Sequence, residues 1–422
     1  MRRRLRDSPL PFILGLAITT IGSAIGALDS TSITNGPSGH GGGGAIATGA
    51  FISELILAAG LSVPYVPRMI GRFTIQRLFV ACNLLTALTW MFGGLVILLG
   101  ANGRITLFVL APIFGVLTGF LGIQTPIWAK ATFASEGMAN AYARLSLVQG
   151  IAWGVGAGIG GVMISLPRGG LGIFTRGVLA IPLTYAALRF APEALPALTK
   201  APRAVWRGIR STLSENPALR RATLLGCGIA MAAAPMLSLI VPIADALRAQ
   251  PLIPGASLLM IGTSIGEVFA PLIVSIMSKR MANDRGASLV AMACGFVMLG
   301  FAAASSLTNH RTELALWCLI GIAFGATRFA ARAFNVGDAV GDNPSHEAQA
   351  LATYRFTTSL VAPIGVIVWS LLLAKVSAFG AVLTGGIVLI LFASPPLVRS
   401  AKDQSPDGLE QRREPERPTP RG

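Results

Sequence analysis

Twelve apolar runs, each close to 20 residues long, divide this chain of 422 residues. Cutting the sequence at charges and at Gly/Pro clusters gives the runs 10–28, 44–66, 78–100, 106–128, 145–166, 171–190, 223–247, 257–277, 288–307, 314–334, 351–374 and 377–398. Each run matches the ~20 residues that a membrane-spanning helix needs. Only 12% of the residues are charged, against roughly 25% in a soluble domain. The sequence therefore predicts an all-α polytopic membrane protein with twelve transmembrane helices.

The basic residues lie mostly on one side of these runs. The formal net charge is +16, but only five bases fall in the loops of the other side, namely Arg104, Arg168, Arg248, Arg311 and Lys375. Cytoplasmic loops of membrane proteins carry the excess of Lys and Arg. We therefore expect a multi-pass protein of the inner (plasma) membrane with both termini cytoplasmic. Bases in this arrangement meet anionic lipids, which makes nucleic acid an unlikely partner.

Residues for enzymatic or metal chemistry are missing from the sequence. The four cysteines, Cys82, Cys227, Cys294 and Cys318, all fall inside apolar runs and form no CxxC pair. They are interpreted as small apolar helix residues. No P-loop, GxSxG or HExxH motif occurs. We expect no catalytic residues, no metal and no cofactor.

Charged residues repeat at nearly constant spacing through the chain. Glu54 and Glu267 are 213 residues apart, each in the middle of an apolar run. Glu136 with Arg144 is repeated 211 residues later by Glu347 with Arg355. A chain built twice from a six-span unit has the layout of a secondary transporter.

This repeat predicts four regions. They are an N-terminal six-helix bundle (1–190), a cytoplasmic linker (191–222), a C-terminal six-helix bundle (223–398) and a disordered cytoplasmic tail (399–422). The linker is rich in Pro and bases, and the charged, Pro-rich tail is typical of disorder.

Three local motifs resemble those of the major facilitator superfamily. The loop 67–72 is similar to its Asp-Arg-x-Gly-Arg loop at Gly71 and Arg72, although Arg68 stands at the acidic position. The fifth run resembles the antiporter motif of that family at Gly156, Gly160 and Gly161, although Ala152 and Ala157 replace a Gly and the Pro. Gly154 and Gly158 belong to the same stripe of glycines. The stretch 28–35 is similar to a motif of drug:proton antiporters. The resemblance implies two pseudo-symmetric six-helix bundles that work by alternating access.

The glycines of the fifth run have GxxxG spacing, which lets two helix backbones approach closely. Either they pack statically, or they form a smooth surface along which the two halves rock.

Four charged residues are candidates for proton coupling or substrate binding. A carboxylate at mid-membrane depth costs about 2.5–3.5 kcal/mol or more, so it faces a cavity or a partner. Glu54 and Glu267 fit this description, and either can instead be a structural carboxyl, with Thr263 as a partner for Glu267. Asp29, like Asp245, lies at an outer helix end where it can simply be solvated. Arg328 either lines a cavity or snorkels, and snorkelling is also expected for Arg176.

A cytoplasmic gate is implied by the resemblance. In the family, acids at the starts of spans five and eleven meet bases of the loops in the other half. Here the expected cross-pairs join Glu347 to Arg68 or Arg72, and Glu136 to Lys279 or Arg280. The alternative is a solvated surface pair worth about 0–1 kcal/mol.

The predicted function is proton-coupled efflux of a small hydrophobic compound by a monomer. The spans are rich in Ala, Gly, Leu and Met and poor in Asn and Gln, which suits an apolar substrate better than a sugar. Uptake of a small anionic metabolite through Arg328 is the first alternative. A transport-inactive membrane scaffold or sensor is the second.

Overall fold

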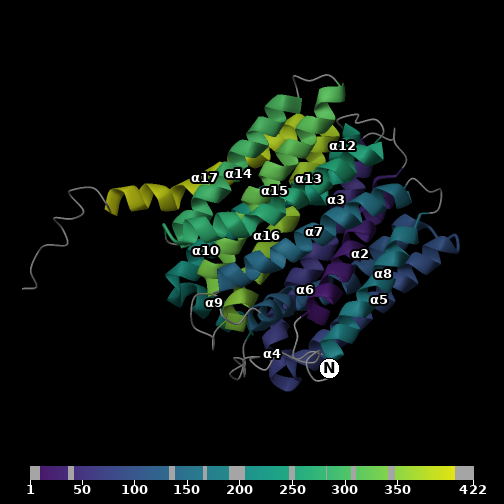
Figure 1. Cartoon of the computed structure of the whole chain (residues 1–422), viewed down its shortest axis with the longest axis horizontal. Coiled ribbons are helices and arrows are strands. Elements are labelled where there is room, and N and C mark those ends of the chain that lie inside the picture. The colour runs from purple at the N-terminus through teal and green to yellow at the C-terminus, as the bar shows by residue number, and fades with distance from the viewer. Residues whose placement is uncertain are drawn as a thin grey trace, which may run out of the picture.

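The computed structural model describes residues 10–36, 42–132, 138–164, 169–189, 205–246, 252–281, 283–305, 310–340 and 347–403. Helices make up almost all of these residues, and no strand occurs among them (Figure 1). The elements are α2 (Leu10–Asn35), α3 (Gly42–Ser62), η1 (Val63–Tyr65), α4 (Val66–Arg72), α5 (Ile75–Leu98), α6 (Gly103–Thr132), α7 (Met138–Ile164), α8 (Leu171–Arg189), α9 (Val205–Glu215), α10 (Pro217–Ala232), α11 (Ala234–Ser238), α12 (Ile240–Ala246), α13 (Leu252–Ser278), α14 (Asn283–Ser305), α15 (His310–Val340), α16 (Glu347–Lys375) and α17 (Ala378–Asp403).

Within the described residues, all twelve predicted spans are largely helical. Among the described residues, ten helices are long and apolar enough to cross a membrane, and 378–394 is a shorter apolar helix. The chain is therefore a multi-pass membrane protein, and the predicted fold class is confirmed. The predicted linker contains the helix α9, and residues of the predicted tail after Asp403 lie outside the described part of the chain.

Two of the spans are interrupted by proline. The second span continues from α3 through η1 into α4, where Pro64 and Pro67 lie in the first turns. The seventh span is divided into α10, α11 and α12, and Pro235 lies in the first turn of α11. Proline lacks a backbone N–H, so it begins a helical segment more easily than it continues one.

Two pairs of helices join the N-terminal and C-terminal bundles. In Figure 1, α5 and α8 lie on one side of the molecule and α10 and α17 on the other. Between them α3 packs against α16, and α7 packs against α13. Small residues permit both contacts. A Cβ atom at Gly60 of α3 would lie 2.8 Å from Cβ of Ser359, and a Cβ atom at Gly150 of α7 would lie 2.9 Å from Cβ of Glu267.

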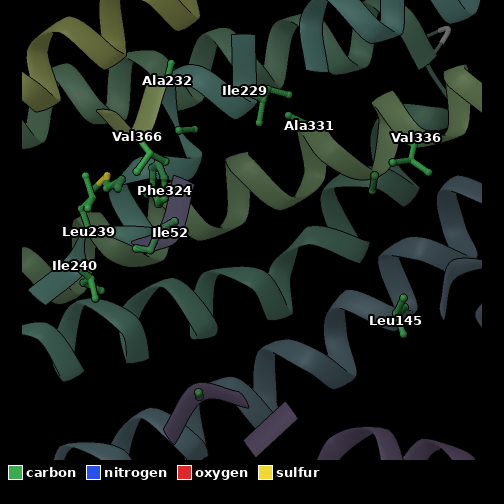
Figure 2. Packing of buried hydrophobic residues seen from close by; sticks show 14 of the residues in the cluster. Ile52, Leu145, Ile229, Ala232, Leu239, Ile240, Phe324, Ala331, Val336 and Val366 are labelled. Atoms are coloured by element: carbon green, nitrogen blue, oxygen red, sulfur yellow. The ribbon is translucent and has the colours of Figure 1, made fainter. Parts of the chain in front are cut away.

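Buried apolar side chains fill both bundles. Figure 2 shows Ile52 of α3 and Leu145 of α7 from the first bundle with Phe324 of α15 and Val366 of α16 from the second. Aromatic rings add to the first bundle, where Trp128 stacks on Phe79 at 4.9 Å between ring centroids.

The linker helix α9 lies at one end of the molecule, called here the α9 end. It contacts η1 of the first bundle and both α10 and α16 of the second (Figure 1). A side-chain hydrogen bond from Gln349 Nε2 to Thr212 Oγ1, 2.9 Å long, joins α16 to α9. The linker therefore touches both halves at the end predicted to be cytoplasmic.

Candidate functional site

A cavity of about 460 Å³ lies between the two bundles. Its walls come from α2, α3, α5, α6, α7 and α8 of the first bundle and from α11, α12, α13 and α15 of the second. The broken seventh span contributes Leu237, Ser238 and Ile240, which flank the junction of α11 and α12. Cavities at the interface of two repeats, next to a discontinuous helix, are where transporters bind their substrates.

Glu267 is the carboxyl group of this cavity. Its side chain is 4% exposed, and the absence of a side chain at Gly150 makes the room for it. The charges of Arg328 and Arg332, four residues apart on α15, act on the carboxyl. Thr263, expected as a structural partner, instead donates its hydroxyl proton to the carbonyl oxygen of Leu259 at 2.8 Å. Glu267 therefore shares the cavity with two cations of α15 that act on its carboxyl group.

Arg328 also lines the cavity, where its guanidinium carbon lies 5.0 Å from the centroid of the Phe329 ring. Its neighbour Arg332 on the same helix is a second cavity residue that the sequence analysis did not single out. The spacing of four residues places both on one face of α15. That regularity is the signal by which Arg332 might have been found.

Glu54 does not line either of the two cavities described for this chain. It is half-buried and lies on the same face of α3 as the exposed residues Ala50, Leu57 and Leu61. Three other residues of α3 line the cavity, namely Phe51, Ile52 and Leu55. Glu267 thus lines the cavity and Glu54 does not, although each lies in the middle of an apolar run.

Asp29 is 5% exposed and holds the start of α8. Its Oδ2 accepts hydrogen bonds from the backbone N–H groups of Gly170 at 3.1 Å and Ile173 at 3.0 Å. The expectation of a solvated helix end is therefore wrong for this residue. Asp245 lies in α12, and its side chain is outside the described part.

Arg176 of α8 is a cavity residue, and the expectation that it snorkels is wrong. Its guanidinium carbon lies 3.9 Å from the centroid of the Trp90 ring. Both residues line the cavity of 460 Å³.

A second cavity of about 330 Å³ shares Trp90, Arg176 and Arg332 with the first. It adds Arg355 of α16, Leu145 of α7 and a set of hydroxyl and amide side chains. Three arginines and no carboxyl group line it among the described residues. The two cavities together are therefore strongly cationic, with Glu267 as the acid among their lining residues.

The predicted gate lies only partly in the described region. Arg68 and Gly71 are in α4, with Arg68 half-buried, and α4 packs against α16. Arg72, Lys279 and Arg280 are exposed. Glu347 begins α16, but its side chain is outside the described part, as is the whole of Glu136. Both cross-pairs remain predictions.

The glycines of α7 lie against two different helices, α2 and α13. Cβ atoms at Gly156 and Gly160 would meet the backbone of α2 at Ile21 and Ile25, within the same bundle. A Cβ atom at Gly154 would lie 3.1 Å from Cβ of Ser264 in the other bundle. Gly158 has nothing within 4 Å, and Gly161 follows Gly160 in the helix. Close packing within the first bundle accounts for Gly156 and Gly160.

No protein-family model matches the sequence, and no curated protein matches it. Solved structures do share its fold. The human organic anion transporter MFSD10 (TETRAN) is 14% identical, with 91% of this chain and 97% of that chain covered at a TM-score of 0.65. A mutant of the nucleoside transporter NupG is also 14% identical, with 90% and 98% covered at a TM-score of 0.59. The chain therefore has the fold of major facilitator superfamily transporters, as the resemblance of its motifs implied.

Proposed function

We propose that this protein is a proton-coupled secondary transporter that carries a small organic compound by alternating access. The observation that carries the proposal is the cavity between the two bundles, lined from both halves and containing Glu267 opposite Arg328 and Arg332. Rocking of two pseudo-symmetric halves about such a site would expose it to each side of the membrane in turn.

Glu267 is our candidate for the group that exchanges protons. When ionised, it offsets one of the two positive charges on α15. When Glu267 is protonated, both positive charges of α15 are available to attract an anionic substrate in the cavity. Binding of a proton and binding of a charged substrate would therefore influence each other through a shared charge balance. Glu54 is a weaker candidate, because it lies away from both cavities.

The predicted efflux of a hydrophobic compound has partial support. Apolar groups such as Phe51, Leu55, Trp153 and Met260 line the cavity and suit an apolar portion of the substrate. The arginines suit a charged portion as well.

The direction of transport remains a prediction, as does the orientation with α9 in the cytoplasm. The orientation is tested by attaching an impermeant thiol reagent to cysteines placed at the exposed residues Asn102 and Ser214. In intact cells we expect labelling at Asn102 and none at Ser214.

The function itself is tested by flux in proteoliposomes. A panel of small acids, amines and neutral aromatic compounds is offered to the full-length protein under an imposed pH gradient. We expect at least one compound to move against its own gradient, in a direction that reverses with the pH gradient. Glu267→Gln should abolish this uphill movement but retain exchange of labelled for unlabelled compound. Glu54→Gln is the competing variant: if it abolishes the uphill movement and Glu267→Gln does not, Glu54 is the coupling group. Absence of any protein-dependent flux would contradict the proposal and favour the scaffold alternative.

A further inference from the structure

Arg176 is held in the cavity by an aromatic platform. Its guanidinium lies 3.9 Å above the Trp90 ring, and the other face of that ring stacks on Phe114 with 3.5 Å between centroids and 7° between planes. Phe114 is 1% exposed and Trp90 is 2% exposed, so the platform is rigid. A guanidinium stacked on an aromatic face keeps N–H groups available for a further partner.

The neighbouring helix α2 leaves room for this arginine. Gly22 and Gly26 lie one turn apart on α2 and face α8. A Cβ atom at Gly26 would lie 2.5 Å from Cδ of Arg176, and one at Gly22 would lie 3.2 Å from its Cα. The side chain therefore runs through a passage made by missing side chains. An arginine that snorkelled to the membrane surface would need no such passage.

Among the described residues, Arg176 contacts the Trp90 ring. None of them supplies Arg176 with a negative charge or a hydrogen-bond acceptor. Glu267, the acid of the cavity, is engaged with the charges of Arg328 and Arg332 on α15. Arginine stays protonated in proteins, and Arg176 is half-buried on the wall of both cavities. Its cation–π contact leaves the positive charge in place. The cavity therefore offers this charge to an anion that enters it.

We propose that Arg176 binds the carboxylate of the transported compound, which is a small aromatic or otherwise flat organic monoanion. This inference rests on the proposed transport function and names its substrate class. The planar fork of arginine matches a carboxylate with two parallel hydrogen bonds. Thr20 and Ser23 of α2 line both cavities beside Arg176 and can donate further hydrogen bonds. The apolar side chains of Phe51 and Trp153 flank the space left for the flat body.

The position of Arg176 also suggests how the anion moves. Arg176 and Arg332 border both cavities, and Arg355 lines only the one that adjoins Leu145. An anion leaving the first cavity in that direction passes from one guanidinium to the next and meets no carboxylate among the described lining residues. Fixed cations along a path lower the cost of moving an anion through a low-dielectric region.

The test is equilibrium binding to the purified full-length protein in lipid nanodiscs. The probes are radiolabelled benzoate and 2-naphthoate, each paired with its neutral amide, benzamide or 2-naphthamide. For the wild type we expect at least one acid to bind at least tenfold more tightly than its amide. Arg176→Gln should weaken binding of that acid at least tenfold and leave amide binding unchanged. Arg176→Lys should retain part of the affinity, because it keeps the charge but loses the fork.

Arg77→Gln is the matched control, since Arg77 is an exposed base that lines neither cavity. It removes one positive charge and should leave acid binding unchanged. Thermal unfolding of each variant verifies that it is folded. If Arg176→Gln fails to fold, Trp90→Leu, which removes the platform, is expected to weaken acid binding instead.

The inference is overturned if neither acid binds better than its amide, or if folded Arg176→Gln binds the acid as the wild type does. These results leave the transport proposal standing whenever neutral compounds or amines still show protein-dependent flux. Conversely, acid binding that depends on Arg176 without any flux in proteoliposomes supports the binding site and contradicts the transport function. The two failures are therefore distinguishable.

Discussion

The carboxylate of Asp29 in α2 accepts a hydrogen bond of 3.0 Å from the backbone N–H of Ile173, in the first turn of α8. The first N–H groups of a helix have no partner within the helix itself. Asp29 therefore acts as a cap supplied by a neighbouring helix. A Cβ atom at Gly172 would lie 2.8 Å from Cβ of Asp29, so the two helices approach closely at this point. This contact fixes the start of the helix that carries Arg176.

Removing this cap should destabilise the protein. We expect Asp29→Ala to lower the unfolding temperature, because it leaves two buried N–H groups unpaired at about 1–3 kcal/mol for each unsatisfied group. Asp29→Asn should cost less, since its amide oxygen still accepts. Thermal unfolding in detergent measures both. If Asp29→Ala instead unfolds like the wild type but abolishes transport driven by a pH gradient, Asp29 is a coupling residue.

The contact between the bundles at Gly150 gives a second prediction. Gly150→Ala would bring a methyl group to 2.9 Å from Cβ of Glu267, and overpacking of this kind costs about 1–3 kcal/mol. We expect a lower unfolding temperature and slower transport. Gly158→Ala on the same helix is the control, because nothing lies within 4 Å of the added methyl. It should be neutral or stabilising by about 0.5–1 kcal/mol. Equal behaviour of the two variants would argue against a close contact at Gly150.

The fold class and the approximate places of the spans could be predicted from the sequence, because a lipid environment demands long apolar runs whatever their packing. The bounds are less exact, since α2 continues to Asn35 and the seventh span is divided into α10, α11 and α12. The places of Glu54 and Glu267 in the middle of apolar runs predict that both lie at mid-membrane depth, but they do not predict the direction of either side chain. Each residue turns a helix by about 100°, so direction depends on which neighbours a helix meets. That is why Glu267 lines the cavity and Glu54 does not.

Arg176 shows what the sequence alone does not reveal. An arginine near the end of a span is predicted to snorkel to the membrane surface. Its true environment depends on two glycines more than 140 residues earlier in the chain, Gly22 and Gly26, which face it only because α2 packs against α8. Trp90 comes from a third helix, α5. Such a site is made by tertiary contacts, and a single sequence carries no signal for them.

The α9 end contains a titratable cluster with a predictable pH dependence. Asp338 lies beyond the predicted tenth span, where burial and the charge of Asp284 raise its pKa to about 6 while Arg221 lowers it. The folded protein therefore holds the Asp338 proton more tightly than the unfolded chain does. The stability that this proton contributes is complete below about pH 4 and is lost as the pH rises to about 6. We expect the unfolding temperature to fall across that window in the wild type and to fall less in Asp338→Asn.

Asp284 provides the check on this assignment. It forms an ion pair with Arg221 at 3.4 Å, and its negative charge disfavours ionisation of Asp338. In Asp284→Asn the pKa of Asp338 should fall, so the loss of stability should be smaller and should end at a lower pH than in the wild type. An unfolding profile identical in Asp338→Asn and the wild type between pH 4 and 6 would assign the pH dependence to other groups.

The bond between Gln349 and Thr212 should help to keep the α9 end closed. Because α9 contacts both bundles, separating them at this end requires some of those contacts to break. Thr212→Val removes the hydroxyl with little change of shape, and a hydrogen bond is worth about 0.5–1.5 kcal/mol. We expect a cysteine placed at Thr19, in the second cavity, to react up to tenfold faster with a thiol reagent in this variant. Ser214→Ala is the control, since that hydroxyl bonds only within α9, to Ser211. Equal rates of cysteine labelling in the wild type, Thr212→Val and Ser214→Ala would show that the bond between Gln349 and Thr212 does not help to close this end.

The final prediction concerns the gate between α4 and α16. The two helices pack together, α4 carries Arg68, and α16 begins at Glu347. Opposite charges at this junction would attract when the α9 end is closed and separate when it opens. Arg68→Glu alone and Glu347→Arg alone should each impair transport, because each places like charges together. The double swap should recover part of the rate, since it restores the attraction with the signs exchanged. Arg77→Glu reverses an exposed charge outside this junction and should have little effect. If both single swaps transport as well as Arg77→Glu does, the pair is a solvated surface feature, and α4 and α16 are held together by packing alone.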